Sequence, residues 1–285
     1  MNITLKQLEA FVWVADLRSF NKAAERLATT QPNISGRIAK LEGLLGGRLL
    51  DRDTMQVTPL GARMLKRARD VLAAMDALVV ESGEAGLYDG VLRLGVTEMV
   101  AETWLRAFLV RLADAFPKMD VELTVDFSAA LEKRLAERAI DLALQNAPFQ
   151  RAMSGEVALG TYPMVWVAAP GVTEVAGQPV LTHGRDTILF QQIAAHFAAQ
   201  GGAAVRLVPS SNLATGLLMA MDGRGVTVVP EAMARGALAA GKLVQIDYGW
   251  APEPLRFFAR YDAERTQAAV AQSAAIALDT ANHFS

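Results

Sequence analysis

The feature that most constrains the fold of this chain is the segment TTQPNISGRIAKLE, in which a proline precedes apolar residues at helical spacing. Proline has no N–H group and its ring blocks a helix interior, but the first turn of a helix has unpaired donors and accepts it. Pro32 therefore predicts the start of a helix that is capped by Thr29 or Thr30. The apolar spacing predicts that this helix runs from Gln31 to about Leu45.

The predicted helix has one apolar stripe and one polar face. The stripe, which we expect to be buried, consists of Ile34, Ile38, Leu41 and Leu45. At about 100° per residue, the opposite face consists of Asn33, Gly36, Arg37 and Lys40, with Ser35 at its flank. Amide and hydroxyl side chains can hydrogen-bond base edges or phosphates, and basic ones can neutralise phosphates, so this face suits DNA. An ordinary solvated helix face is the alternative interpretation.

A tight arrangement of helices surrounds this segment. Apolar residues at three- and four-residue spacing predict a first helix that ends near Leu17. Asn21 can cap a short second helix, and the two threonines before Pro32 then form a tight turn. This order lets the Pro32 helix project from the body, as a recognition helix does in the DNA major groove. In the next stretch, RLLDRDTMQVTPLG, apolar residues flank a polar turn, which predicts a hairpin wing with Arg52 near its tip.

Thr58 and Pro59 repeat the same start signal and predict a fourth helix, a long one, after the wing. Its apolar stripe consists of Leu60, Met64, Ala68, Val71, Leu72, Met75, Leu78 and Val79. Since nothing nearby in the sequence covers this stripe, we expect it to pair with a second copy of the chain. Packing onto its own chain is the alternative. Gly83, Gly86 and Gly90 then predict a linker.

Length and charge indicate two parts with different partners. At 285 residues, the chain is long enough for two domains. The net charge of −2 hides an asymmetry: residues 1–70 hold twelve Lys and Arg against seven Asp and Glu, whereas the remainder holds sixteen against twenty-three. A basic head before an acidic body is expected if only the head meets a polyanion. A chance fluctuation in the distribution of charged residues is the alternative explanation of this asymmetry.

Several classes of protein do not fit the residues of this chain. With no cysteine, it has no disulfide, thiol nucleophile or cysteine metal site. HExxH, GxSxG and P-loop motifs are missing, and its three histidines suit surface or packing positions, so we expect neither an enzyme nor a bound metal or cofactor. Lys6, Glu9 and Asp16 interrupt the N-terminal apolar residues, and no apolar run is long enough for a membrane span, which predicts a cytoplasmic protein.

From Val91 the sequence changes to short β-rich runs that alternate with amphipathic helices, which is typical of parallel sheets built from βαβ units. Two successive series of this kind predict two α/β lobes with a cleft between them. The predicted fold class is therefore multi-domain α/β, with an α-rich winged helix-turn-helix head, a long linker helix and a two-lobed α/β domain. The predicted boundaries are 1–58 for the head, 59–90 for the linker helix and hinge, 91–161 with 263–285 for lobe I, and 162–262 for lobe II.

The cleft between the lobes is the expected site for a small molecule. In open α/β sheets, ligands bind outside the carboxyl ends of the strands, where helix N-termini also point. The predicted effector-binding residues are Thr97, Glu98, Phe127, Ser128, Asn146, Thr161, Ser210, Ser211 and Asn212. Simple helix capping is the alternative role for each hydroxyl or amide. Because Glu98 places a fixed negative charge at a helix start, we expect an effector that is neutral, amine-bearing or aromatic rather than polyanionic.

Three runs carry a specific resemblance: AAERLATTQPNISGRIAKLE, LGGRLLDR and VTPLGARML occur in this order between Leu5 and Leu72. This segment resembles the winged helix-turn-helix of LysR-type transcriptional regulators. The body is similar in pattern to the effector-binding domain of that family, with DLAL and GRGVTVVP as its most characteristic pieces. The resemblance implies a homodimer or homotetramer that binds double-stranded DNA at an inverted repeat and responds to a small-molecule effector in the cleft, with RNA polymerase as a further candidate partner.

Carried over by position, the family's recognition helix corresponds to Gln31, Pro32, Asn33, Ser35 and Arg37, and its wing residue to Arg52. Together with Thr30 and Lys40, these are the predicted DNA-binding residues. Gly36 departs from the family pattern, since many members have Arg or Lys directly after the serine. Either Arg37 makes that contact or the missing side chain lets the helix approach more closely, at a cost of about 1 kcal/mol of helix stability. A small-molecule sensor that does not bind DNA is the alternative function.

Overall fold

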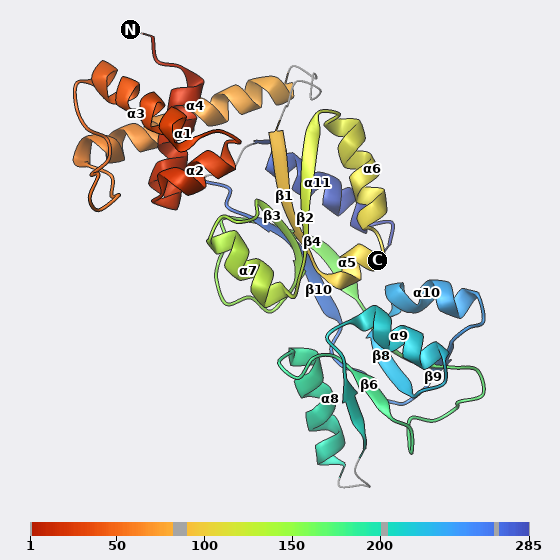
Figure 1. Ribbon diagram of the computed structural model, residues 1–285. Helices are drawn as coiled ribbons and strands as arrows, with labels where there is room; N and C mark the ends of the chain where they lie inside the picture. Colours follow the sequence, from red (N-terminus) through yellow and green to blue (C-terminus); the bar gives the residue numbers. More distant parts are fainter. Residues whose placement is uncertain (1, 82–89, 201–204, 265–267, 285) are drawn as a thin grey trace.

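The chain folds into a helical head and two α/β lobes, as the computed structural model shows for residues 2–81, 90–200, 205–264 and 268–284 (Figure 1). The head contains α1 (Leu5–Leu17), α2 (Phe20–Arg26), α3 (Gln31–Leu45) and α4 (Pro59–Glu81). Its core is apolar and comes from all four helices, with Phe11, Ile34, Leu41 and Leu49 fully buried. The predicted fold class is confirmed by this arrangement.

Local signals place the start of α3 as expected and the start of α2 differently. Thr30 is the N-cap of α3, and Pro32 lies in its first turn. The prediction that Asn21 caps α2 was wrong, because the Ser19 side chain accepts a hydrogen bond from the Lys22 N–H at 3.3 Å. Asn21 instead lies within the first turn of α2, where its backbone is already helical.

A short hairpin joins α3 to α4, as the sequence predicted. Leu50 and Val57 form an antiparallel bridge, and the Thr58 hydroxyl accepts a hydrogen bond from the Gly61 N–H at 3.0 Å at the start of α4. This start lies so close to the hairpin that a Cβ atom on Gly61 would be 2.0 Å from the Leu49 carbonyl oxygen. Only glycine allows that approach.

The apolar stripe of α4 divides into two parts. Its first half packs into the head, where Ala68 is buried and Leu60, Met64 and Leu72 are partly buried. Further along, Val71, Met75 and Leu78 are 47%, 41% and 61% exposed. The Val79 side chain and the predicted linker glycines Gly83 and Gly86 lie outside the described residues, and Gly90 begins β1. Neither α4 nor any other described helix is long and apolar enough to cross a membrane.

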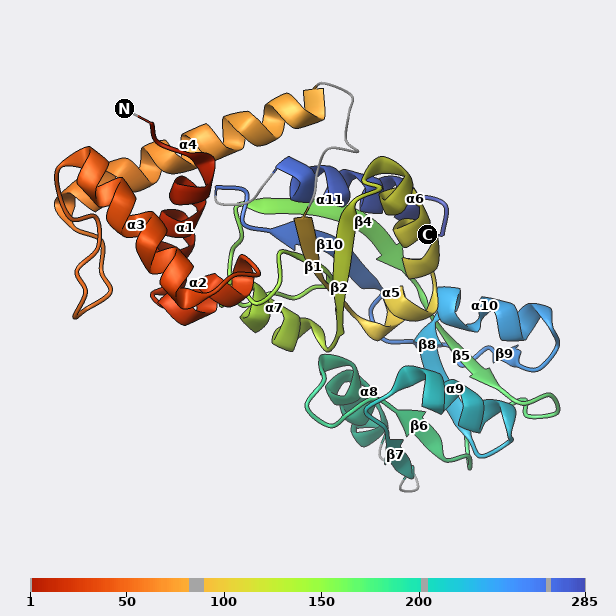
Figure 2. The same ribbon diagram turned by 45° about the horizontal axis from the view of Figure 1, so that its top comes forward.

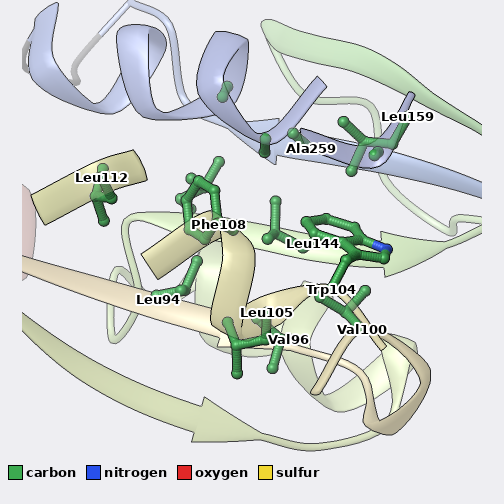
Figure 3. Packing of buried hydrophobic residues seen from close by; sticks show 14 of the residues in the cluster. Leu94, Val96, Val100, Trp104, Leu105, Phe108, Leu112, Leu144, Leu159 and Ala259 are labelled. Carbon is green, nitrogen blue, oxygen red and sulfur yellow. The ribbon is translucent and has the colours of Figure 1, made fainter. Parts of the chain in front are cut away.

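Lobe I is a mixed sheet with the strand order β2-β1-β3-β10-β4. Its elements are β1 (Gly90–Val96), α5 (Glu98–Glu102), α6 (Leu105–Ala115), β2 (Met119–Val125), α7 (Ser128–Ala136), β3 (Leu142–Asn146), β4 (Gly155–Tyr162), β10 (Leu255–Tyr261) and α11 (Ala268–Ala281). The strands β1, β2 and β3 are parallel, and β10 is antiparallel to its neighbours. One face packs against α5, α6 and α11 around Trp104 and Phe108 (Figure 3), and the other packs against α7.

Lobe II repeats this plan with the strand order β7-β6-β8-β5-β9. Its elements are β5 (Met164–Ala168), β6 (Val180–Thr182), α8 (Ile188–Ala199), β7 (Leu207–Pro209), α9 (Leu213–Met221), β8 (Val226–Pro230), α10 (Glu231–Ala239) and β9 (Val244–Ile246). One face of the sheet packs against α8, and the other packs against α9 and α10. Both faces are therefore buried, which explains the continuous apolar run of β8.

Within the lobes, the structure differs from the sequence-based expectations in three places. One helix was expected from about Glu98 to Phe116, but Thr103 and Trp104 separate α5 from α6. The strands β4 and β6 were not predicted. The predicted lobe II, 162–262, includes β10, which the structure places in the sheet of lobe I. The chain crosses between lobes before β5 and before β10, and a crossing carries no local sequence signal.

The head lies beside lobe I (Figure 2). A group of largely buried charged side chains joins the two parts. The Asp16 side chain, 3% exposed, forms ion pairs with Arg69 of α4 and with Arg138, which follows α7. Arg26 at the end of α2 forms an ion pair with Asp141, just before β3. We call these five residues the head–lobe ion-pair cluster. The Trp13 ring lies 4.4 Å from the Arg26 guanidinium and 5.5 Å from that of Arg138.

Candidate functional site

The polar side of α3 lies on the surface of the head. Thr30, Gln31, Pro32, Asn33 and Lys40 are exposed, and Ser35 and Arg37 are half-buried. On the opposite side of the same helix, the predicted stripe residues Ile34, Ile38 and Leu41 are buried. The Asn33 amide donates a hydrogen bond to the Thr29 hydroxyl at 3.2 Å. The eight predicted DNA-binding residues therefore include seven on or next to one exposed helix face.

Arg37 has a neighbour within the protein that the sequence did not reveal. Burial raises the pKa of Glu9 on α1, and the charges of Arg37 and Lys6 oppose this shift. Arg37 thus lies close enough to Glu9 for their charges to interact across the α1–α3 contact. Lys40, one turn later, is exposed. The basic side chain that is freest to meet a phosphate on this helix is therefore Lys40.

Arg52, the eighth predicted DNA-binding residue, lies at the tip of the wing. It is exposed between Asp51 and Asp53. The Asp51 carboxylate accepts hydrogen bonds from the N–H groups of Thr54 at 2.8 Å and Asp53 at 3.0 Å, which lowers its pKa. These bonds hold the turn in shape, so that Arg52 projects from an ordered tip.

Gly36 lies on the exposed face of α3. A Cβ atom built at this position meets no described atom within 4 Å. The head itself therefore has room for a side chain at residue 36, and internal packing does not explain the glycine. This observation fits the interpretation that Gly36 allows a close approach by a partner.

Four predicted effector residues lie at the carboxyl edge of the lobe I sheet. Thr97 follows β1, Phe127 and Ser128 follow β2, and Asn146 ends β3. The Ser128 hydroxyl donates to the Asn146 side-chain oxygen at 2.8 Å and accepts from the Asn146 N–H at 3.1 Å. The Thr97 hydroxyl is buried and has no hydrogen-bond partner among the described residues. Three parallel strand ends thus present polar groups together, as expected from the topology.

The predicted residues of lobe II make local hydrogen bonds. The Ser210 hydroxyl donates to the Asn212 carbonyl and accepts from the Asn212 N–H, at 3.0 and 3.1 Å. The Asn212 side chain caps α9 by accepting from the Thr215 N–H at 2.7 Å, and Ser211 is exposed. Thr161 is an exposed residue of β4 that pairs with Arg256 of β10. Capping, the alternative role, is therefore what Asn212 does in this structure.

Glu98 connects the two lobes. Its carboxylate oxygens accept hydrogen bonds from the N–H groups of Leu213 at 2.7 Å and Ala214 at 3.0 Å, the first two residues of α9. The sequence indicated a charge at the start of α5, but the groups that it binds belong to the other lobe. Leu213 and Ala214 act through their backbone, so side-chain chemistry could not have identified them.

His183 is a half-buried histidine of lobe II, and its ring environment was not indicated by the sequence. His183 follows β6, a strand of three residues that is too short for a periodic signal. Its Nε2 atom is buried and has no hydrogen-bond partner among the described residues. Burial lowers the pKa of His183 from 6.5 to about 4, and the Val228 backbone opposes this shift. The ring is therefore neutral in the folded protein at neutral pH.

This depressed pKa makes the stability of the protein depend on pH. Between about pH 6.5 and pH 4 the unfolded chain binds a proton at His183 that the folded chain does not, so the free energy of unfolding falls as the pH falls. From pH 7 to pH 5 the expected loss is about 2 kcal/mol for this one group. Urea unfolding at both pH values should show a smaller loss for His183→Asn. His283→Asn, at an exposed position, is the control; an equal pH dependence in all three proteins would contradict the assignment.

Two family models match the chain, one in the head and one in the lobes, with residues 63–84 between them. Residues 5–62 match the bacterial regulatory helix-turn-helix protein, lysR family, and residues 85–281 match the LysR substrate binding domain. The first covers α1 to α3 and the wing, and the second covers both lobes. A "Probable hydrogen peroxide-inducible genes activator" of Streptomyces viridosporus is 38% identical over 148 residues, which are 51% of this chain and 47% of that protein.

Solved structures share the fold over the whole chain. A full-length point variant of OxyR from Pseudomonas aeruginosa has a TM-score of 0.63 and 22% identity, covering 100% of this chain and 99% of that one. Vibrio fischeri DarR in complex with DNA has a TM-score of 0.58 and 22% identity, covering 98% and 99%. The alternative of a sensor that does not bind DNA finds no support in these similarities. The chain belongs to the LysR family of DNA-binding transcriptional regulators and has an effector-binding domain.

Proposed function

We propose that this regulator reads duplex DNA with the exposed face of α3, contacts phosphates with the wing, and responds to a small molecule bound between the lobes. The observation that supports the DNA-reading role is the division of α3 into a buried apolar side and an exposed polar side. Gln31 and Asn33 extend from its first turn, the part of a recognition helix that contacts base edges. Lys40 and Arg52, both exposed, are the basic side chains that we propose for phosphate contacts.

A second copy of the chain is the proposed partner of α4. Val71, Met75 and Leu78 leave an apolar stripe exposed on the described part of this helix. Pairing two such stripes buries both, and a two-fold axis through them would place two α3 helices on one DNA duplex. We therefore propose a homodimer or a tetramer built from such dimers, acting in the cytoplasm on an inverted-repeat operator.

We propose that the effector binds noncovalently and that its action involves no reaction of a protein thiol. One relative is named for hydrogen peroxide, and protein thiolates are the side chains that peroxide oxidises most selectively. This chain has no cysteine. The polar edge formed by Thr97, Ser128 and Asn146 supports a bound small molecule instead, and the relatives support a regulator rather than an enzyme.

The DNA-binding role is tested by titrating a nonspecific duplex at several salt concentrations. Affinity should fall steeply with salt because phosphate contacts release counterions. The slope of the logarithm of the binding constant against the logarithm of the salt concentration should become smaller by about one in Lys40→Ala and in Arg52→Ala. Arg67→Ala, at an exposed basic position on α4, should leave this slope unchanged. Selection from a random duplex library should show that Gln31→Ala or Asn33→Ala changes the preferred bases, at about 1–3 kcal/mol per good contact. Salt-independent binding, or equal effects of Lys40→Ala and Arg67→Ala, would contradict the proposal.

A further inference from the structure

The contact between Glu98 and α9 has the geometry of a bound carboxylate. Glu98 belongs to lobe I, directly after β1, and α9 belongs to lobe II. Each carboxylate oxygen accepts one N–H group, at 2.7 Å from Leu213 and at 3.0 Å from Ala214. Such paired, charge-assisted bonds are stronger than neutral ones. Glu98 is thus held at α9 as the carboxylate of a small molecule would be.

The donors at the start of α9 are all in use. The first two N–H groups of the helix bind Glu98, and the third, from Thr215, binds the Asn212 side chain at 2.7 Å. The fourth, from Gly216, binds the Asn212 carbonyl at 3.3 Å. An anionic ligand could therefore reach these donors only by displacing Glu98.

We infer that Glu98 is an internal ligand of lobe II, which holds the lobes together without an effector and excludes carboxylate and phosphate groups from this end of the effector site. The inference rests on the proposed effector site and adds the chemical class of its ligand. The covalent chain crosses between the lobes before β5 and before β10, and Glu98 adds a noncovalent link.

The charge of Glu98 also decides what can bind beside it. Within the part of the chain that the structure describes, Glu98 takes part in no ion pair; it meets only the partial positive charge of the α9 terminus. A second negative group next to it would be repelled, because the helix end compensates only about half a charge. An effector with an ammonium or amidinium group would instead compensate the rest of the negative charge of Glu98. The favoured effector is cationic or neutral at this end.

The lobe-bridging role is tested by measuring the distance between the lobes without any ligand. Because the 285-residue chain has no cysteine, spin labels attach only at introduced ones, in Lys133→Cys of α7 and Lys242→Cys after α10, both exposed positions. Dilution with unlabelled chain removes distances between copies. Pulsed electron paramagnetic resonance should give one short distance between the two spin labels when Glu98 is kept. In Glu98→Ala the distribution of this distance should be longer and broader.

Glu102→Gln is the matched control, since it removes an exposed charge from the same short helix. It should leave the distances unchanged, and Glu98→Gln should have an intermediate effect because an amide oxygen can still accept one bond. If Glu98→Ala gave the same distances as the unchanged chain, the bridge would be refuted, whatever binds at the effector site.

Ligand class is tested separately with benzylamine, benzyl alcohol and benzoate, which share a ring and differ in charge. Calorimetry should show that benzylamine binds at least about tenfold more tightly than benzoate, and that Glu98→Gln removes this preference. Equal binding of benzoate and benzylamine to the unchanged chain would refute the exclusion of anions. If none of the three bound, the result would count against the proposed effector site, and the distances would still decide the bridge.

Discussion

Replacing Asp16 with asparagine is expected to lower the free energy of unfolding by about 3 kcal/mol and to release the head from lobe I. The Asp16 side chain is 3% exposed and pairs with Arg69 within the head and with Arg138 of lobe I. Asparagine removes the negative charge that Arg69 and Arg138 share, and these two side chains are only 23% and 13% exposed, so water compensates their charges poorly. Arg138 keeps Asp262, at 3.5 Å, which places the loss at the lower end of the usual range.

Urea unfolding followed by tryptophan fluorescence measures this effect, because the Trp13 ring lies close to the guanidinium groups of both Arg26 and Arg138. Asp70→Asn is the control on α4, where Asp70 is 54% exposed and pairs with Arg67 at 3.6 Å. An exposed pair contributes at most about 1 kcal/mol. If both variants lost the same small amount, the head–lobe ion-pair cluster would not hold the two parts together.

Arg260→Met is expected to destabilise lobe I by about 3–5 kcal/mol at pH 7. Arg260, 1% exposed, forms ion pairs with Glu156 at 2.9 Å and Glu132 at 3.3 Å, and its guanidinium lies 3.7 Å from the centre of the Phe149 ring. Methionine fills much of the space but leaves the buried Glu132 carboxylate without its cation. Arg111→Met, which removes an exposed pair with Asp279, should cost less than about 1 kcal/mol.

The effect of Arg260→Met should depend on pH in a defined direction. Burial alone would raise the pKa of Glu132, but the N–H groups of Gln150 and Arg151 and the Arg260 guanidinium together lower it. The stabilising charge on Glu132 is therefore complete above its ordinary pKa of 4.5 and is lost as the pH falls through the lower, folded-state value. Chemical unfolding at pH 7 and pH 4 should show a smaller difference between Arg260→Met and the unchanged chain at pH 4. A constant difference would mean that the loss comes from packing alone.

Much of the head and many elements of the lobes were predictable because their signals are local. The start of α3 follows from Thr30 and Pro32. The sequence also predicts helices around Ile188–Ala199 and Glu231–Ala239, which are the bounds of α8 and α10. Side chains three or four residues apart share a helix face whatever the rest of the chain does. The exposed polar face of α3 therefore follows from sequence spacing, although the neighbour of Arg37 does not.

Contacts between distant residues were decided by the tertiary structure. Asp16 and Arg138 are 122 residues apart in the chain, and Glu98 and Leu213 are 115 apart. Glu98 looked like a charge on its own helix, and nothing around it indicated that it binds the backbone of the other lobe. The short strand β6, which His183 directly follows, was likewise visible only from its neighbours β7 and β8.

The sequence by itself determined the helix–turn–helix order, the wing, the basic head and the two successive α/β lobes. Those properties depend on caps, turns and spacing within a few residues. Only the tertiary structure decided that β10 belongs to the sheet of lobe I and that buried ion pairs join the head to this lobe. It also decided that Glu98 binds the N-terminus of α9. The physical reason is that an ion pair or a helix-end hydrogen bond needs two groups at about 3 Å, and chain topology alone brings residues so far apart in sequence to that distance.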